Sequence, residues 1–100
     1  MKKDCDIASV LNFMNKKWIM VILKTMHDGH ETFTSIKDEI GDINQKILST
    51  RLSEMEEEGF IVREIVQQKP IKIRYSLTKK GESFCAHVCG LLDWQKKWGK

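Results

Sequence analysis

Residues Ile43–Arg63, INQKILSTRLSEMEEEGFIVR, combine the pattern of a capped amphipathic helix with a stop signal and the start of a strand. Asn44 is a favoured helix N-cap residue, and Gly59 is a favoured residue just beyond a helix end. Ile43 precedes the cap and can pack against Leu48 in the first turns, which fixes the direction from which the chain enters. The stretch therefore predicts a helix from Asn44 that stops at Gly59.

This helix has two chemically distinct sides. At about 100° per residue, its apolar residues gather on one side, which must face a core: Ile47, Leu48, Leu52 and Met55. The opposite side has short hydroxyls, one cation and an amide at the flank: Lys46, Ser49, Thr50, Ser53 and Gln45. Such side chains can hydrogen-bond base edges and phosphates. The alternative is an ordinary solvated helix face, and the composition of this face alone does not separate the two.

The end of the helix is acidic, with glutamates at positions 54, 56, 57 and 58. Phosphates would be repelled there, so only the leading half can approach DNA, as the recognition helices of helix-turn-helix proteins do. Arg51 lies close to the core stripe and could either reach a phosphate or pair with Glu54; the structural role is slightly favoured. The candidate DNA-binding residues of this helix are Asn44, Gln45, Lys46, Ser49, Thr50, Arg51 and Ser53.

Three further helical patterns precede this one. Apolar residues recur at helical spacing after Asp6, at Ile7, Val10, Leu11 and Met14. Residues 18–26 are nearly continuously apolar and predict a buried helix that ends near Gly29. Thr34 is expected to cap a short helix that contains Ile36 and Ile40 and stops at Gly41.

A hairpin and a last helix follow. Residues 61–66 and 72–77 predict two strands, and the second alternates, with Ile73, Tyr75 and Leu77 on one side. Residues 67–70 form the expected tip, because Pro70 cannot donate to a sheet ladder. Thr78 is expected to cap a final helix through Trp98. The hairpin has four basic residues, which suit a phosphate backbone or minor groove but could equally discourage strand aggregation: Arg63, Lys69, Lys72 and Arg74.

The predicted order is helix, helix, helix, tight turn, helix, hairpin, helix. This order predicts a mainly α fold with a small β-hairpin wing, a winged helix-turn-helix. With 100 residues, the chain is long enough for one such domain, covering residues 1–100, and not for two.

The last helix is apolar over too wide an arc for one contact. We therefore expect it to pack against its own domain on one side and against a second copy of the chain on another, because two-fold dimers are the commonest oligomers. The alternative is a single large core that covers everything. The candidate interface combines the first and last helices: Val10, Leu11, Met14, Val88, Leu91, Leu92, Trp94 and Trp98.

Composition and motifs limit the other possibilities. The net charge of +3 permits a nucleic-acid partner without requiring one. Asp4 and Asp6 follow the basic start before any apolar run, so we expect no signal peptide, no membrane and a cytoplasmic location. The three cysteines match no zinc spacing, and no phosphate loop, nucleophile elbow or carboxylate pair occurs. The sequence therefore predicts no enzyme activity, no metal and no cofactor.

Several motifs together resemble HxlR-type bacterial regulators, which are similar to MarR proteins. They are Cys5, Lys17-Trp18 before an apolar helix, Phe33-Thr34-Ser35-Ile36, the whole stretch Ile43–Arg63, and Tyr75-Ser-Leu-Thr-Lys-Lys-Gly81. They occur in order and cover nearly the whole chain. The resemblance implies a winged-helix homodimer that binds double-stranded DNA at pseudo-palindromic operators and regulates transcription.

Some members of this family sense oxidants or electrophiles through the cysteine that Cys5 matches, which makes Cys5 a possible redox sensor. The chain departs from the family here: Asp6 stands where proline is common, and a neighbouring anion raises a thiol pKa. Asn15-Lys16 replaces the usual two glycines, and Arg74 replaces a frequent acidic residue. The sequence specifies no effector. The competing hypothesis is a winged-helix module that binds a protein partner and has no specific DNA site.

Overall fold

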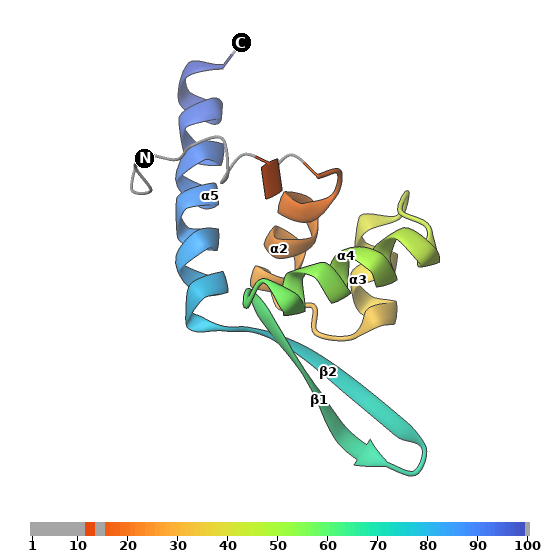
Figure 1. Cartoon of the computed structure of the whole chain (residues 1–100). Coiled ribbons are helices and arrows are strands. Elements are labelled where there is room, and N and C mark those ends of the chain that lie inside the picture. The colour runs from red at the N-terminus through yellow and green to blue at the C-terminus, as the bar shows by residue number, and fades with distance from the viewer. Residues whose placement is uncertain (1–11, 14–15, 100) are drawn as a thin grey trace.

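The computed structural model describes residues 12–13 and 16–99. Figure 1 shows a small helical body with a long hairpin projecting from it and one long helix along its side. In chain order the elements are α2 (Ile19–His27), α3 (Phe33–Ile40), α4 (Gln45–Glu57), β1 (Ile61–Gln68), β2 (Ile71–Leu77) and α5 (Lys79–Trp98). The predicted order of elements is confirmed from α2 onward. The predicted helix over residues 7–14 and Cys5 lie outside the described residues, except for Asn12 and Phe13, which are helical.

The core forms where α2, α3 and α4 meet the base of the hairpin. Its buried side chains are Ile19, Ile22, Leu23, Met26, Ile36, Ile43, Leu48, Leu52, Met55, Phe60, Ile61 and Cys85. The burial of Ile43 together with Leu48 agrees with the staple predicted at the start of α4. This single cluster fixes the side of α4 that faces inward, and with it the side that faces out.

Side-chain caps set the helix starts. The Asn44 side-chain oxygen accepts a hydrogen bond from the Ile47 amide at 2.8 Å, and the Thr78 hydroxyl oxygen accepts one from the Gly81 amide at 3.1 Å. Both caps confirm the predictions. The predicted cap of α3 is wrong: Thr32, and not Thr34, accepts from the Ser35 amide at 3.0 Å.

The physical reason for the earlier start of α3 is Phe33. This side chain is partly buried against the core. A helix that begins at Phe33 places it on one stripe with Ile36 and Ile40, at spacings of three and four residues. Beginning at Thr34 would leave the ring outside that stripe, so burial of the aromatic side chain decides the boundary.

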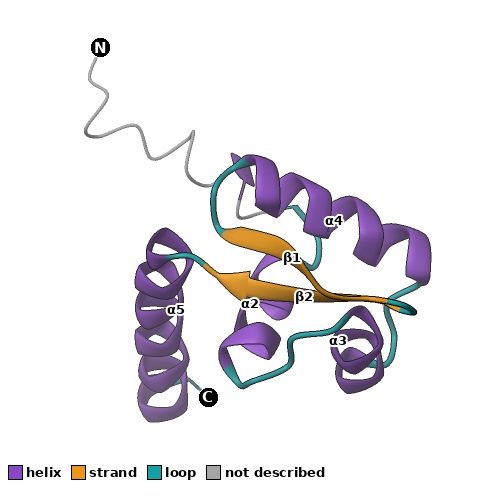
Figure 2. Cartoon of the chain, turned by 90° about the horizontal axis from the view of Figure 1, so that it is seen from below, coloured by secondary structure: helices purple, strands orange, loops and turns teal. Residues whose placement is uncertain are grey.

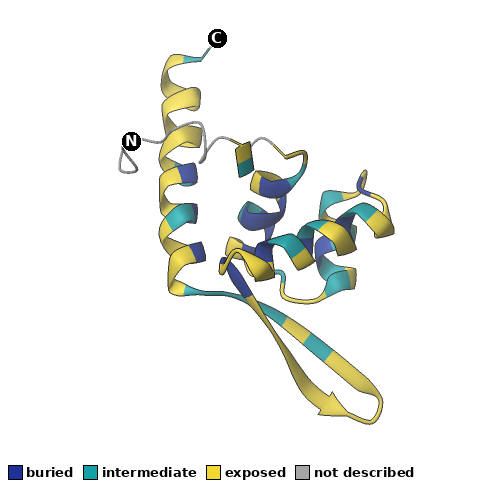
Figure 3. Cartoon of the chain, viewed as in Figure 1, coloured by how far each residue is buried: buried dark blue, intermediate teal, exposed yellow. Residues whose placement is uncertain are grey.

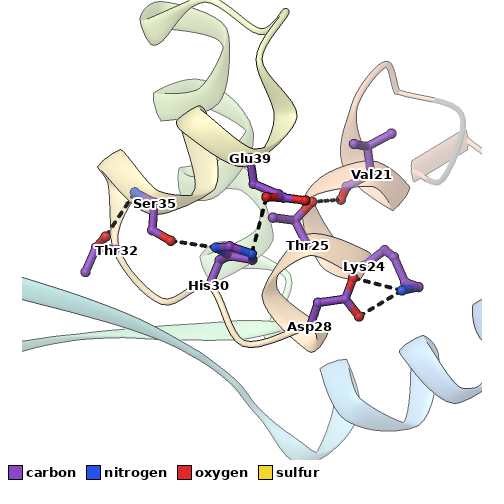
Figure 4. A network of polar contacts seen from close by, with 8 residues as sticks. All are labelled: Val21, Lys24, Thr25, Asp28, His30, Thr32, Ser35 and Glu39. Carbon is purple, nitrogen blue, oxygen red and sulfur yellow. Dashed lines mark hydrogen bonds and ion pairs between the residues drawn. The ribbon is translucent and has the colours of Figure 1, made fainter.

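A polar network holds the turn between α2 and α3 (Figure 4). His30 lies in this turn, and its Nδ1 and the Ser35 hydroxyl are hydrogen-bonded, 2.6 Å apart. Its other ring nitrogen faces a Glu39 oxygen at 3.7 Å. His30 thus contacts both the first and the last turn of α3, which orients α3 relative to α2.

The hairpin is longer than predicted. The strands reach Gln68 and Ile71, so only Lys69 and Pro70 remain at the tip instead of four residues. The register shifts between Ile65 and Gln67, and beyond this shift Gln67 and Gln68 still pair with residues of β2. The glutamines predicted in the tip therefore pair with β2, and Pro70 lies at the tip as expected.

The base of the hairpin is tied to the body. The Tyr75 amide donates to the Glu31 carbonyl at 2.8 Å, and the Thr78 amide donates to the Phe60 carbonyl at 3.0 Å. Gly81 packs so closely that a Cβ there would lie 2.2 Å from the Phe60 carbonyl oxygen. Viewed from below, β1 lies on the side of α4, and β2 lies on the side of α3 (Figure 2).

Helix α5 is only partly covered by the body. Its first half packs against α2 and buries Cys85 and Val88, whereas its second half is almost wholly exposed (Figure 3). Within the described residues, no helix is both long and apolar enough to cross a membrane.

Candidate nucleic-acid interface

Helix α4 presents its polar side to solvent. Leu48, Leu52 and Met55 are at most 2 % exposed, and Ile47 is partly buried against them. The opposite residues are all exposed: Gln45, Lys46, Ser49, Thr50 and Ser53. The predicted division of this helix is therefore confirmed, and no other described part of the chain covers the polar side.

The charge along α4 is strongly uneven. No acidic residue lies in its first turn, where the helix dipole is positive, and Lys46 adds a full positive charge. Its trailing half has Glu54, Glu56 and Glu57, which line an open hollow together with Ser49, Thr50 and Ser53. The helix thus has a leading half that attracts an anionic backbone and a trailing half that repels one.

Arg51 has a structural role on the inner edge of α4. Its Nε donates to the Lys17 carbonyl at 2.8 Å, and its Nη1 donates to Glu54 Oε1, also at 2.8 Å. Burial raises the pKa of Glu54, but the hydrogen bond and charge of Arg51 and the nearby Lys16 outweigh it, so the pKa is lowered. The pairing with Glu54 that the sequence favoured is confirmed.

The wing projects beside α4. Lys69 lies exposed at its tip, and Lys72 is exposed on β2. Arg74 is exposed too, but its guanidinium donates to Glu64 on the paired strand at 2.8 Å. Because side chains alternate along a strand, Lys72 and Arg74 lie on the face opposite to Tyr75.

The other face of the wing meets α4 at a corner that the sequence prediction missed. Arg63 and Tyr75 are cross-strand partners, and they line a hollow together with Ser49, Leu52, Ser53 and Glu56 of α4. The sequence placed Arg63 only among the four basic residues of the hairpin. It could not show that strand pairing brings Arg63 beside the polar side of α4, because that depends on how the hairpin packs against α4.

Helix α5 exposes an apolar stripe. Leu91, Trp94 and Trp98 are 59–66 % exposed, and Leu92 is 43 % exposed. His87, Gly90, Leu91 and Trp94 line an open, mostly apolar groove on this stripe. The alternative that one core covers all of α5 is wrong. Among the residues of α5 predicted to lie in the dimer interface, Val88 is an exception. It is only 6 % exposed in the single chain, so we assign it to the core.

The two described cysteines differ in environment. Cys85 is 1 % exposed, and its Sγ lies 3.5 Å from the Leu23 carbonyl, to which it donates. Burial raises the pKa of this thiol. A buried structural role is confirmed for Cys85, whereas Cys89 is only partly buried. In the described part of the chain, no group of three or more metal-binding side chains occurs.

Comparison with known proteins agrees with this geometry. Residues 13–100 match the family model described as HxlR-like helix-turn-helix. An HTH-type transcriptional regulator of Methanothermobacter thermautotrophicus is 34 % identical over 95 residues, which are 95 % of this chain and 72 % of that protein. The HTH-type transcriptional regulator YodB of Bacillus subtilis is 33 % identical over 88 residues, which are 88 % of this chain and 79 % of YodB.

Solved structures of two regulators are similar to this chain over almost its whole length. The reduced form of YodB has a TM-score of 0.82 at 28 % identity and covers 98 % of this chain and 95 % of its own. The redox regulator HypR in its oxidized form has a TM-score of 0.82 at 29 % identity and covers 93 % of this chain and 96 % of its own. The backbone of this chain is therefore similar to theirs over more than nine tenths of its length. The chain therefore belongs to the HxlR-like helix-turn-helix family, a winged-helix family of transcriptional regulators and not of enzymes.

Proposed function

We propose that this regulator binds a specific, pseudo-palindromic operator as a homodimer in the cytoplasm and that residues 1–100 act as one DNA-binding unit. The observation that supports this most is the exposed leading half of α4, with Lys46, Ser49 and Thr50 beside a projecting basic wing. In this proposal, α4 enters the major groove, where hydroxyl and amide groups distinguish base pairs. The wing contacts the adjacent backbone or minor groove through Lys69, Lys72 and Arg74.

The dimer is supported by the exposed stripe on α5. Leu91, Trp94 and Trp98 recur at spacings of three and four residues, so they form one continuous strip along the exposed half of the helix. A second copy is the simplest cover for it, because a two-fold interface uses the same surface twice. Val10, Leu11 and Met14 are proposed to complete the interface. The two copies of α4 would then enter successive major grooves, about 34–36 Å apart.

A thiol switch on this dimer is a second layer of the proposal. Similar structures include YodB in reduced, diamide-treated and quinone-bound forms and HypR in reduced and oxidized forms. Cys85 is unsuited to such a role here, because it is buried and its pKa is raised. Cys5, which matches the cysteine through which some members of the family sense oxidants or electrophiles, is the proposed sensor. Its modification would shift the dimer geometry and the spacing of the two α4 helices.

Selection of bound fragments from genomic DNA with the purified protein tests the specific-binding proposal. We expect enrichment of short duplexes with two related half-sites about one helical turn apart. If no fragment binds better than random DNA at physiological salt, the proposal of a specific operator fails. A protein complex that survives nuclease treatment would then favour the interaction module.

The switch is tested by comparing operator binding of the parent and Cys5→Ser with and without oxidant. We expect the oxidant to change binding by the parent only. Equal responses of the two proteins would show that Cys5 is not the sensor.

A further inference from the structure

Arg63 differs from the other arginines of the chain. Arginine occurs at positions 51, 63 and 74. Arg51 and Arg74 each bind a glutamate oxygen at 2.8 Å. Arg63 is exposed on β1 and, within residues 12–13 and 16–99, makes no ion pair or side-chain hydrogen bond. Among the described residues nothing pairs with its charge, which suits Arg63 to an anionic partner.

The surroundings of Arg63 are built from two elements. It lies opposite Tyr75 in the hairpin, and both side chains face α4 across a hollow of about 220 Å³. Ser49, Ser53 and Glu56 line the α4 side of this hollow. Burial raises the pKa of Tyr75, the charge of Arg63 lowers it and that of Glu56 raises it, so both charges act on the phenol. The hollow thus joins one guanidinium, three hydroxyls and one carboxylate.

Such a set of donors suits a phosphate. A guanidinium presents a planar fork of N–H groups that matches phosphate oxygens, and serine and tyrosine hydroxyls are common phosphate contacts in DNA complexes. The hollow also lies where α4 meets the wing. If α4 occupies the major groove and the wing follows the adjacent minor groove, the sugar-phosphate strand between the two grooves passes this corner.

We propose that Arg63, with the hydroxyls of Ser49, Ser53 and Tyr75, binds one DNA backbone phosphate at the corner between α4 and the wing, and that Glu56 weakens this contact. The inference rests on the proposed DNA binding and adds a positioning contact to it. A phosphate held there fixes how far α4 enters the groove, because the contact spans both elements. The contact itself is independent of base sequence.

The edge of a base pair is the alternative occupant of the hollow. A substitution of Glu56 distinguishes a bound phosphate from a bound base edge. Arginine can bind guanine while a glutamate accepts from the amino group of cytosine, so the pair could recognise a G·C pair. With a phosphate in the hollow, the Glu56 carboxylate repels it, and Glu56→Gln tightens binding to every duplex. With a base pair there, Glu56→Gln removes an acceptor, weakens binding and changes base preference.

The experiment measures affinities for a selected genomic duplex and for a random duplex of equal length, each over a range of salt concentrations. We expect Arg63→Gln to weaken binding to both by roughly tenfold or more. The slope of log affinity against log salt should fall in magnitude by about 0.9, the value for one lost phosphate contact. Tyr75→Phe should weaken both affinities severalfold with an unchanged slope, because it removes a hydroxyl and no charge.

Matched controls isolate the hollow. Lys96→Gln removes one positive charge from α5, and Glu58→Gln removes one negative charge from the exposed end of α4 without lining the hollow. Each should change affinity less than its counterpart, Arg63→Gln or Glu56→Gln. Urea unfolding of every variant establishes that the comparison is between folded proteins. If Arg63→Gln is too unstable, Arg63→Lys should keep the slope and lose affinity.

Different results would exclude the phosphate contact of Arg63 and the specific binding of an operator. If Arg63→Gln binds both duplexes within twofold of the parent with the parent slope, the phosphate contact is wrong, even when the parent prefers the selected duplex. Weaker binding and altered base preference in Glu56→Gln would also overturn it, in favour of a base edge. If the parent shows no preference for the selected duplex, specific regulation fails, while the random duplex still tests Arg63.

Discussion

Arg51 on α4 donates a hydrogen bond from Nε to the carbonyl oxygen of Lys17, 34 residues earlier in the chain, at 2.8 Å. The next residue, Trp18, has a φ of 81°, the left-handed conformation that is rare for a large side chain. Lys16 reaches Glu54 of the same helix at 3.4 Å. The segment that enters α2 is therefore tied to α4 by its backbone and its charges.

Loss of this tie should lower stability. We expect Arg51→Ala to reduce the free energy of unfolding by roughly 1–3 kcal/mol, because the Lys17 carbonyl and the partly buried Glu54 carboxylate lose their donors. Arg74→Ala is the control: its pair with Glu64 is about half exposed, so its loss should cost less than about 1 kcal/mol. Urea titrations measure both, and equal losses would contradict the structural role of Arg51.

The same cluster predicts a pH dependence. The pKa of Glu54 is lowered from 4.5 in the folded chain, so its contribution to stability is present above pH 4.5 and is lost as the pH falls through the lowered pKa. The stability advantage of the parent over Glu54→Gln should therefore shrink progressively below pH 4.5. Urea midpoints of both proteins over an acid series test this. A difference that stays constant with pH would show that the charge of Glu54 is not involved.

Gly81 should not tolerate a larger side chain. A Cβ at this position would lie 2.2 Å from the Phe60 carbonyl oxygen, and backbone on both sides must shift to relieve the clash. We expect Gly81→Ala to destabilise the chain by about 1–3 kcal/mol or more. Ser83→Ala, exposed in the same helix, should change stability by no more than about 0.5 kcal/mol. Thermal unfolding of the two variants makes the comparison, and an unaffected Gly81→Ala would contradict the close packing of α5.

The exposed stripe of α5 predicts the effect of polar substitutions on assembly. Leu91→Gln combined with Trp94→Gln should shift the protein from dimer to monomer in sedimentation equilibrium, because both side chains are at least 59 % exposed in the single chain. Helix content should be retained, since neither side chain belongs to the core. Lys96→Gln is the control for an exposed change on the same helix. A dimer of parental affinity in the double variant would place the interface elsewhere.

Local chemistry explains the parts of the fold that the sequence predicted well. Helix α4 begins after Asn44 because the Asn44 side chain can cap the first turn. It ends before Gly59 because glycine can adopt a φ of 84°. The spacing of the apolar residues in α4 identified its buried side, because this pattern depends only on residues within the helix. Where tertiary packing overrides a local signal, the prediction was wrong: burial of Phe33 makes Thr32 the cap instead of Thr34.

The parts of the site that could not be predicted depend on contacts between distant segments. The register shift after Ile65 extends the wing to Gln68, and nothing in the glutamine-rich stretch signals it. The hollow between Arg63 and Ser49 exists only because β1 packs beside α4. Likewise, the helical period grouped Val88 with Leu91, but the position of α2 decides that one is buried and the other exposed.

Titration of operator duplexes with two α4 variants shows whether the leading half of α4 binds DNA. Duplexes selected by the parent from genomic DNA are titrated with Lys46→Ala and Ser49→Ala. We predict that Lys46→Ala weakens binding to selected and random duplexes alike, with a salt slope smaller by about 0.9, whereas Ser49→Ala changes the preferred sequence. If both variants bind the selected duplex with parental affinity, salt slope and sequence preference, this face of α4 is not the DNA-binding surface.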